Sequence, residues 1–165
     1  MATETTPSNV PALGAHAREE VGNELQATLT QLIDLALFGK QLHWTVVGRD
    51  FRSLHLQLDE LIDSWLDLSD TVAERSVAIG HFPDGQAATV ATASEIAPVE
   101  RGPIEDVEVV RVLTHRLVEI TERLRGRMDG LGELDLASQD VLIEVVRALE
   151  QQLWMVRAQL PHGRA

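Results

Sequence analysis

Residues 40–80 read KQLHWTVVGRDFRSLHLQLDELIDSWLDLSDTVAERSVAIG, and the predicted fold is arranged around a turn inside this stretch. Apolar residues recur at helical spacing from about residue 17 to residue 46, and Gly48 breaks that pattern. Asp50 is a good N-cap for a second helix, which we expect to continue to about residue 79. A short connection of this kind joins antiparallel helices. The stretch therefore predicts a helical hairpin.

Two of the six histidines flank this turn. His43 precedes the glycine of the turn, His55 follows it, and Asp59 comes one helical turn after His55. If the two helices are antiparallel, both imidazoles and the carboxylate lie in one neighbourhood. Imidazole and carboxylate groups together suit iron or zinc. The turn is therefore a candidate metal site.

The composition narrows the classes of protein to consider. A chain of 165 residues with 44% apolar residues suits one soluble domain. The formal net charge is −12, and Lys40 is the single lysine. Such a surface repels nucleic-acid phosphates and attracts cations, although acidity also serves solubility alone. Cysteine is absent, which excludes disulfides and thiolate ligands and fits a reducing compartment.

Two further long helices are predicted in the second half of the chain. Residues 81–103 form a long connection with room for one short helix at QAATVATA, residues 86–93. Pro103 suits the first turn of a third helix, and Asp135 can cap a fourth that ends before Pro161. Strand signals, such as alternating β-branched runs, are absent from the sequence.

This pattern predicts an all-α fold, with four long amphipathic helices and one long central crossover. Such an arrangement describes a ferritin-like four-helix bundle. We place the bundle at residues 17–160, between an N-terminal tail of residues 1–16 and a C-terminal tail of residues 161–165. No apolar run is long enough to span a bilayer, and the N-terminal stretch lacks the features of a signal peptide. We therefore expect a cytoplasmic protein.

The second helix carries an acidic stripe. At about 100° per residue, His55, Asp59, Asp63, Asp70 and Glu74 fall within a sector of roughly 100°. A solvated face is the ordinary interpretation of such a stripe. However, lysines at the i+4 positions, which solvated helices favour, are missing here. A bound cation would relieve the repulsion along the row, so we favour metal binding.

The stripe is too long to form a single metal site. Asp59 and Asp70 are separated by about 16 Å of helix, whereas metal–ligand bonds are about 2 Å long. The sequence also contains no Glu-x-x-His, the motif that di-iron bundles use twice. One chain thus offers two half-sites, namely His43, His55 and Asp59 near one end and Asp70 and Glu74 near the other. Two copies of the helix packed antiparallel would complete both sites, so the spacing implies a two-fold dimer.

The same stretch closely resembles the Dps family of mini-ferritins (DNA-binding proteins from starved cells). The family pattern is His-Trp, a second His twelve residues on, Asp four residues later, and then Asp-x-x-x-Glu-Arg. The matching residues here are His43-Trp44, His55, Asp59, Asp70 and Glu74-Arg75. A weaker helical resemblance covers nearly the whole chain. All five ligand positions of the family are filled.

The resemblance implies a function as well as a fold. It implies ferroxidase sites shared by two-fold-related subunits, with His43, His55, Asp59, Asp70 and Glu74 as both metal ligands and catalytic residues. It further implies a shell of twelve subunits that stores ferric mineral, with hydrogen peroxide as the usual oxidant. Iron is the expected metal, and zinc or another divalent ion could occupy the same site.

Further residues are assigned to the surroundings of the site. Lys40 lies one turn before His43 and could pair with a site carboxylate, or it is an ordinary surface lysine. Trp44 is expected in the packed core and, from the resemblance, beside the iron. Asp63 and Asp67 extend the acidic stripe and are candidates for mineral nucleation. Four acidic residues near the last turn are candidates for an iron entry pore: Asp129, Glu133, Asp135 and Asp140.

The expected partner is another copy of this chain, and no membrane partner is expected. DNA-binding members of the family often use a lysine-rich tail, but residues 1–16 carry no basic residue except His16. Counterion release needs several cationic contacts, so the sequence disfavours DNA binding. One alternative is a nucleoid-associated, DNA-protecting protein with a secondary metal site. Another is a zinc hydrolase, which the lack of a His-Glu-x-x-His motif disfavours.

Overall fold

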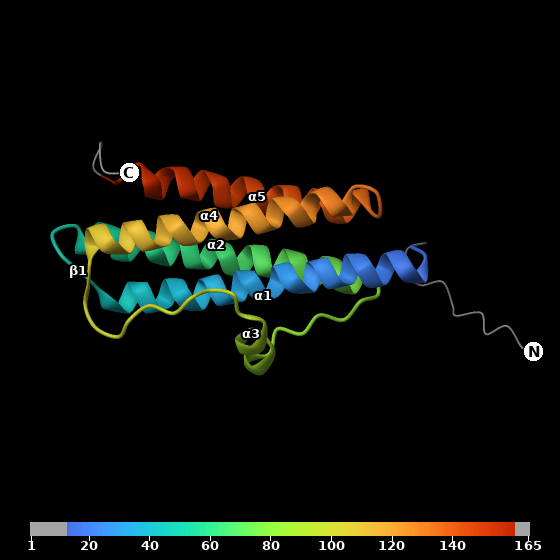
Figure 1. Cartoon of the computed structure of the whole chain (residues 1–165), viewed down its shortest axis with the longest axis horizontal. Helices are drawn as coiled ribbons and strands as arrows, with labels where there is room; N and C mark the ends of the chain where they lie inside the picture. Colours follow the sequence, from blue (N-terminus) through green and yellow to red (C-terminus); the bar gives the residue numbers. More distant parts are fainter. Residues whose placement is uncertain (1–12, 161–165) are drawn as a thin grey trace, which may run out of the picture.

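The computed structural model describes residues 13–160, and four long helices lie alongside one another in it (Figure 1). These helices are α1 (Ala15–Thr45), α2 (Phe51–Ala78), α4 (Asp106–Leu131) and α5 (Leu136–Arg157). A short helix, α3 (Ala87–Ala93), lies in the crossover between α2 and α4. The predicted all-α bundle with its central crossover and short helix is confirmed.

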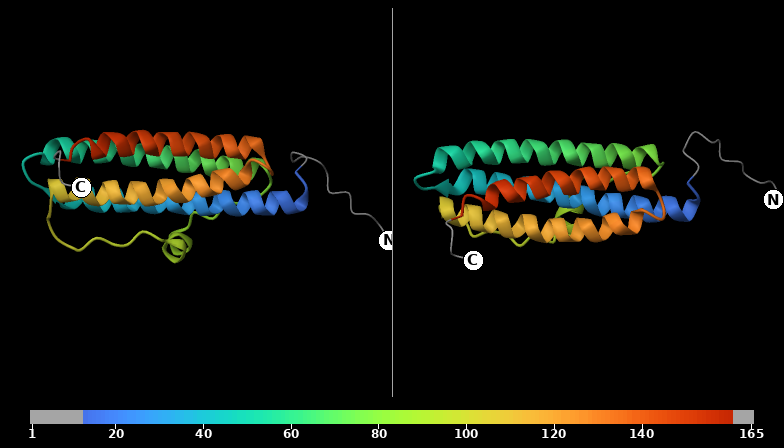
Figure 2. Two further views of the ribbon diagram at one scale, coloured as in Figure 1. Left: turned by 45° about the horizontal axis from the view of Figure 1, so that its top comes forward. Right: turned by 90° about the horizontal axis from the view of Figure 1, so that it is seen from above.

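The bundle consists of two antiparallel helical hairpins. Helix α1 packs mainly against α2, and α4 packs mainly against α5. The crossover runs the length of the bundle beside α1 and returns the chain to the end where α2 begins (Figures 1 and 2). This connection places the start of α4 next to the α1–α2 turn.

Helical periodicity gives each helix one apolar face, and the four faces form a single core. The largest side chain in this core is Trp65 of α2, which is fully buried and donates its indole N–H to Gln152 Oε1 at 2.7 Å. Gly39 of α1 makes room for the indole, because a Cβ there would lie 2.6 Å from the ring. No helix in the described part of the chain is long and apolar enough to cross a membrane.

Several details of the sequence prediction were wrong. Two short strands, β1 (Val46–Val47) and β2 (Ile104–Glu105), pair in parallel, although the sequence showed no strand signal. As a result, α4 begins at Asp106 and Pro103 lies outside its first turn. Asp50 occupies the N-cap position of α2, but its side chain makes no capping hydrogen bond. The predicted tails, residues 1–16 and 161–165, lie almost entirely outside the described residues, so the boundaries of the bundle stay a prediction.

Candidate metal centre

Three side chains meet where α1 ends and α2 begins. His43 lies in the last turn of α1, while His55 and Asp59 lie one turn apart on α2. One ligating atom from each residue falls in a group whose members are all within 4.8 Å of one another. His43 is buried, and the other two residues are partly exposed. The arrangement leaves a site that is anchored in the core and open to solvent.

Both oxygens of Asp59 already have cationic or imidazole partners. Lys40 Nζ donates to Asp59 Oδ1 at 2.6 Å, and His43 Nε2 lies 3.0 Å from Asp59 Oδ2. The hydrogen bond from Lys40, aided by His43 and opposed by desolvation, holds the pKa of the Asp59 carboxyl below its ordinary value. Asp59 is therefore ionised and ready to accept a metal cation, which would compete with Lys40.

The orientation of His55 is set by the backbone of α1. His55 Nδ1 lies 3.1 Å from the carbonyl oxygen of His43. A carbonyl oxygen can only accept, so Nδ1 carries the proton and Nε2 keeps a free lone pair. The two imidazoles also stack, with ring centroids 3.7 Å apart and an interplanar angle of 25°. Hydrogen bonding of one ring nitrogen while the other stays free is the usual arrangement of a metal-binding histidine.

The donor set fits a transition-metal ion. Neutral imidazole nitrogen and carboxylate oxygen are the ligands of non-haem iron and of zinc. His43 Nδ1 is buried and has no hydrogen-bond partner among the described residues. Three ligands from one chain leave coordination positions to be filled by another source.

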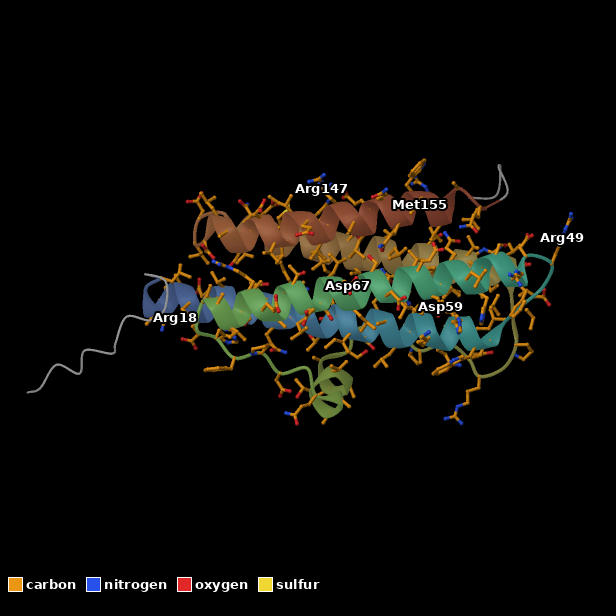
Figure 3. The ribbon with its side chains drawn as sticks, turned by 180° about the vertical axis from the view of Figure 1, so that it is seen from behind. Arg18, Arg49, Asp59, Asp67, Arg147 and Met155 are labelled. Carbon is orange, nitrogen blue, oxygen red and sulfur yellow. The ribbon has the colours of Figure 1, made fainter. Side chains whose placement is uncertain are left out.

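The structure does not bring Asp70 and Glu74 to these three residues. Both are exposed on the C-terminal half of α2, about 16 Å or more further along the helix axis. Neither forms an ion pair with another residue in the 13–160 range. Figure 3 shows Asp59 and Asp67 at successive positions along α2. The candidate ligands of one protomer are thus divided into two groups.

The neighbouring candidates have mixed outcomes. Lys40 does pair with a carboxylate of the site, which was one of the two interpretations left open by the sequence. Trp44 is 70% exposed, so its expected place in the core of the protomer was wrong. The reason is that it follows His43 directly, and consecutive helical residues point in directions about 100° apart. Asp63 and Asp67 are exposed, and their proposed role in nucleation stays a prediction.

The four candidate pore residues differ in their surroundings. Asp129, Glu133 and Asp140 are exposed around the α4–α5 turn. Asp135 makes structural contacts, because it accepts from the Ser138 backbone N–H and pairs with Arg75 Nη2 at 2.6 Å, and the pore role of all four residues stays a prediction. Burial disfavours its ionisation, but the hydrogen bonds from Ser138 and Arg75 outweigh burial and lower the pKa of Asp135. Arg75 thereby ties the end of α2 to this turn.

Comparisons with known proteins agree with this geometry. A family model described as a ferritin-like domain matches residues 22–164. The chain is 31% identical to the DNA protection during starvation protein of Mycolicibacterium smegmatis, over 94% of this chain and 85% of that protein. It is also 31% identical to DNA protection during starvation protein 2 of Deinococcus radiodurans. That match covers 92% of this chain and 63% of the relative, so the chain spans less than two thirds of the relative's length.

A solved structure of Mycobacterium smegmatis Dps in its tetragonal form superposes with a TM-score of 0.88 at 29% identity. The superposition covers 99% of this chain and 96% of that chain. The four-helix bundle and the family model define a ferritin-like protein. Within that class, the chain belongs to the Dps family.

Proposed function

We propose that this protein is a mini-ferritin that oxidises Fe²⁺ at sites shared between two subunits and stores the ferric product. The observation that carries the proposal is the division of five candidate ligands into two groups, one at the α1–α2 turn and one on the C-terminal half of α2. The first half-site holds His43, His55 and Asp59 in contact, and the second holds Asp70 and Glu74 exposed. The first half-site supplies both imidazoles and one carboxylate, and the second supplies two further carboxylates.

The surface of α2 supports the pairing of two copies of this helix. Leu66 is 46% exposed and Val77 is 50% exposed. At about 100° per residue, both fall within the sector of the acidic stripe, and Leu66 lies near the midpoint between the half-sites. An exposed apolar residue at the middle of an otherwise acidic stripe suits contact with a symmetry-related copy. In an antiparallel pair, the acidic ends would then meet the histidine ends.

The proposed reaction balances with hydrogen peroxide as oxidant. Two Fe²⁺ ions each lose one electron, and one peroxide molecule takes up both electrons and two protons to leave two water molecules. Asp59, Asp70 and Glu74 supply negative charge that favours Fe³⁺ over Fe²⁺, and the imidazoles of His43 and His55 supply nitrogen ligands. Two-electron reduction of peroxide would avoid the release of hydroxyl radical.

The assembly that we propose is a shell of twelve subunits built from these two-fold dimers, located in the cytoplasm. A closed shell would place the acidic stripe where ferric ions collect, with Asp63 and Asp67 as nucleation points. The related proteins are named for DNA protection, which makes a DNA-protecting role the second candidate. A net charge of −12 opposes direct contact with DNA, so we propose protection through removal of iron and peroxide.

A subunit-mixing experiment tests the shared site. One variant carries His43→Ala and His55→Ala, and the other carries Asp70→Ala and Glu74→Ala. Each variant alone should lack rapid ferroxidation, measured as ferric absorbance after Fe²⁺ and peroxide are added. Refolded together, a mixed dimer has one complete site and one empty site. Random pairing makes half the dimers mixed, so activity should return to about a quarter of the wild-type rate.

The control is the same mixture without refolding, in which subunits do not exchange and activity should stay absent. Co-assembly is verified by native mass spectrometry of differently tagged subunits. If co-assembled dimers show no recovery, each site is built within one chain and the proposed sharing is wrong. If activity recovers, the two sites of a dimer should lie roughly 22 Å apart, the rise over about fifteen helical residues.

A further inference from the structure

The proton position of His55 depends on where α1 ends. In a continued α-helix, the N–H of Val47 would donate to the carbonyl of His43, four residues earlier. Instead, α1 ends at Thr45, and Val47 lies in β1 opposite Glu105 of β2. The His43 carbonyl is thereby left for His55 Nδ1. The end of α1 at this pair of two-residue strands thus decides which nitrogen of His55 would be available to a bound metal ion.

Asp106 holds the turn that follows these strands. It is the first residue of α4 and is 8% exposed. Its Oδ2 accepts from the backbone N–H of Asp50 at 2.7 Å, and its Oδ1 accepts from the backbone N–H of Val107 at 2.7 Å. One carboxylate therefore links the beginning of α4 to the residue that precedes α2.

Gly48 allows the turn to approach this carboxylate closely. Its φ is 125°, in the region that favours glycine, and a Cβ at this position would lie 2.5 Å from Asp106 Oδ2. The turn is therefore packed directly onto Asp106. Because the turn connects the helices that carry His43 and His55, a shift of the turn changes the distance between the two histidines.

We propose that Asp106 is a positioning residue of the metal centre. It holds the α1–α2 turn in the conformation that ends α1 at Thr45, and so it presents the His43 carbonyl to His55. Within residues 13–160, the Asp106 side chain makes no hydrogen bond to His43 or His55, so its effect passes through the backbone. This inference rests on the proposed metal site and adds a residue on a third helix to it.

Cobalt(II) binding to the assembled protein tests the inference, with Co²⁺ absorption in the visible range as the signal. Loss of an outer hydrogen-bond partner of a metal ligand typically weakens metal binding by about 10- to 100-fold. Asp106 acts one step further out, through the backbone, so for Asp106→Ala we expect a weakening at the lower end of this range, about 10-fold. A second measurement, made without metal, is the ¹⁵N solid-state NMR spectrum of histidine-labelled protein. The signal of His55 is assigned by its disappearance in His55→Ala. It should show a single tautomer, protonated at Nδ1, in the wild type. In Asp106→Ala it should show a mixture of the Nδ1 and Nε2 tautomers.

Asp84→Ala is the matched control. Asp84 also ties a loop, since its carboxylate accepts from the Gln86 backbone N–H at 3.0 Å and from the Thr89 hydroxyl at 2.7 Å. It belongs to the segment between α2 and α3, which leaves α2 at the end of the bundle opposite the α1–α2 turn (Figure 1). Its removal should leave Co²⁺ affinity and the His55 spectrum unchanged.

If Asp106→Ala does not assemble, Asp106→Asn replaces it, because Asn keeps the shape and one of the two acceptor oxygens. The Asn variant should then show a mixture of the two His55 tautomers. A wild-type His55 spectrum and wild-type affinity in the assembled variant would overturn the inference. Failure of the wild type itself to bind Co²⁺ would instead overturn the proposed function, so the two failures are distinguishable.

Discussion

The two halves of α2 carry candidate metal ligands in different surroundings. In the N-terminal half, Asp59 is bonded to Lys40 and His43, and His55 is bonded to the end of α1. In the C-terminal half, Asp70 and Glu74 are exposed to solvent. One group is therefore held in place by contacts within its own chain, whereas the other projects into solvent.

This asymmetry has a physical rationale in a shared site. A preorganised half-site limits the entropy lost when an ion binds, whereas exposed carboxylates adapt to an ion that is already held. The end of α2 is nevertheless fixed in space, because Arg75 pairs with Asp135 and donates to Ser138 Oγ at 2.9 Å. The side chains of Asp70 and Glu74 are thus exposed on a helix whose end is anchored.

Removal of preorganised ligands should have the largest effect. His55→Ala combined with Asp59→Ala deletes two of the three clustered ligands. We expect the rate of ferric absorbance after Fe²⁺ and peroxide to fall by more than about 100-fold, since even outer partners of metal ligands contribute 10- to 100-fold in affinity or activity. Asp63→Ala combined with Asp67→Ala is the matched control on the same helix and should keep the initial rate. Equal rates in the two double variants would contradict the site assignment.

The ion pair between Arg75 and Asp135, which fixes the end of α2, should have a smaller effect. It contributes to the stability of the protein, and that contribution depends on pH. Asp135→Asn removes the charged partner of Arg75, which should cost about 1–3 kcal/mol at pH 7. The pKa of Asp135 is lowered below its ordinary value of 3.8. A carboxyl group whose pKa is lowered by folding stabilises the folded protein at pH values above its ordinary pKa. This stabilisation is lost as the pH falls through the lowered pKa.

Thermal unfolding midpoints of the assembled protein at several pH values measure this contribution. The wild type should exceed Asp135→Asn by several degrees at pH 7, and the gap should narrow below about pH 4. Glu133→Gln, which alters an exposed acid on the same turn, is the control and should stay within about 0.5 kcal/mol of wild type. A gap that is constant with pH would rule out the ion pair as its source.

The fold was largely predictable from the sequence because its signals are long and local. Helices of more than twenty residues repeat their apolar pattern many times, and the long connection contains the prolines that helices avoid. The strands β1 and β2 were missed because two residues cannot display a period. Trp44 was misplaced because composition alone assigns a large aromatic residue to the core.

For the candidate site, the sequence predicted only the contacts made within the α1–α2 hairpin. The spacing of His43, His55 and Asp59 around one turn was sufficient to place them together. The contact of Asp106 with the turn joins residues 56 positions apart, and no pattern in a single sequence reports such a contact. Arg75 was seen in the Dps-like pattern, but its pairing with Asp135 again depends on how two hairpins pack. Distant contacts of this kind require the folded structure.

Lys40 tests the comparison further, because its ammonium group bonds to Asp59, a residue that would also bind a metal cation. Lys40→Ala should strengthen Co²⁺ binding by up to about fivefold at pH 7, because an exposed ion pair makes only a modest contribution. The same change lets the pKa of Asp59 rise toward its ordinary value, so the advantage should shrink as the pH is lowered. Lys40→Arg keeps the charge and is the control. Weaker binding in Lys40→Ala would show that the lysine organises the site and does not compete with the ion.

DNA binding is the smallest effect that we expect, and it concerns the acidic character that both halves of α2 share. The chain carries 26 acidic and 14 basic residues, and the proposed shell would multiply this excess of negative charge. Affinity for duplex DNA arises mainly from cations that displace counterions from phosphates, so an acidic shell has little to contribute. At physiological salt, the assembled protein should leave the mobility of duplex DNA in a gel unchanged.

The control is the same assembled protein with Glu19→Lys and Glu20→Lys, two exposed acidic positions near the start of α1. These changes add a cationic patch to every subunit and should create a salt-sensitive shift. A salt-sensitive shift by the unmodified shell at sub-micromolar protein would reveal a cationic surface formed on assembly, and protection of DNA by direct binding would then be the better proposal.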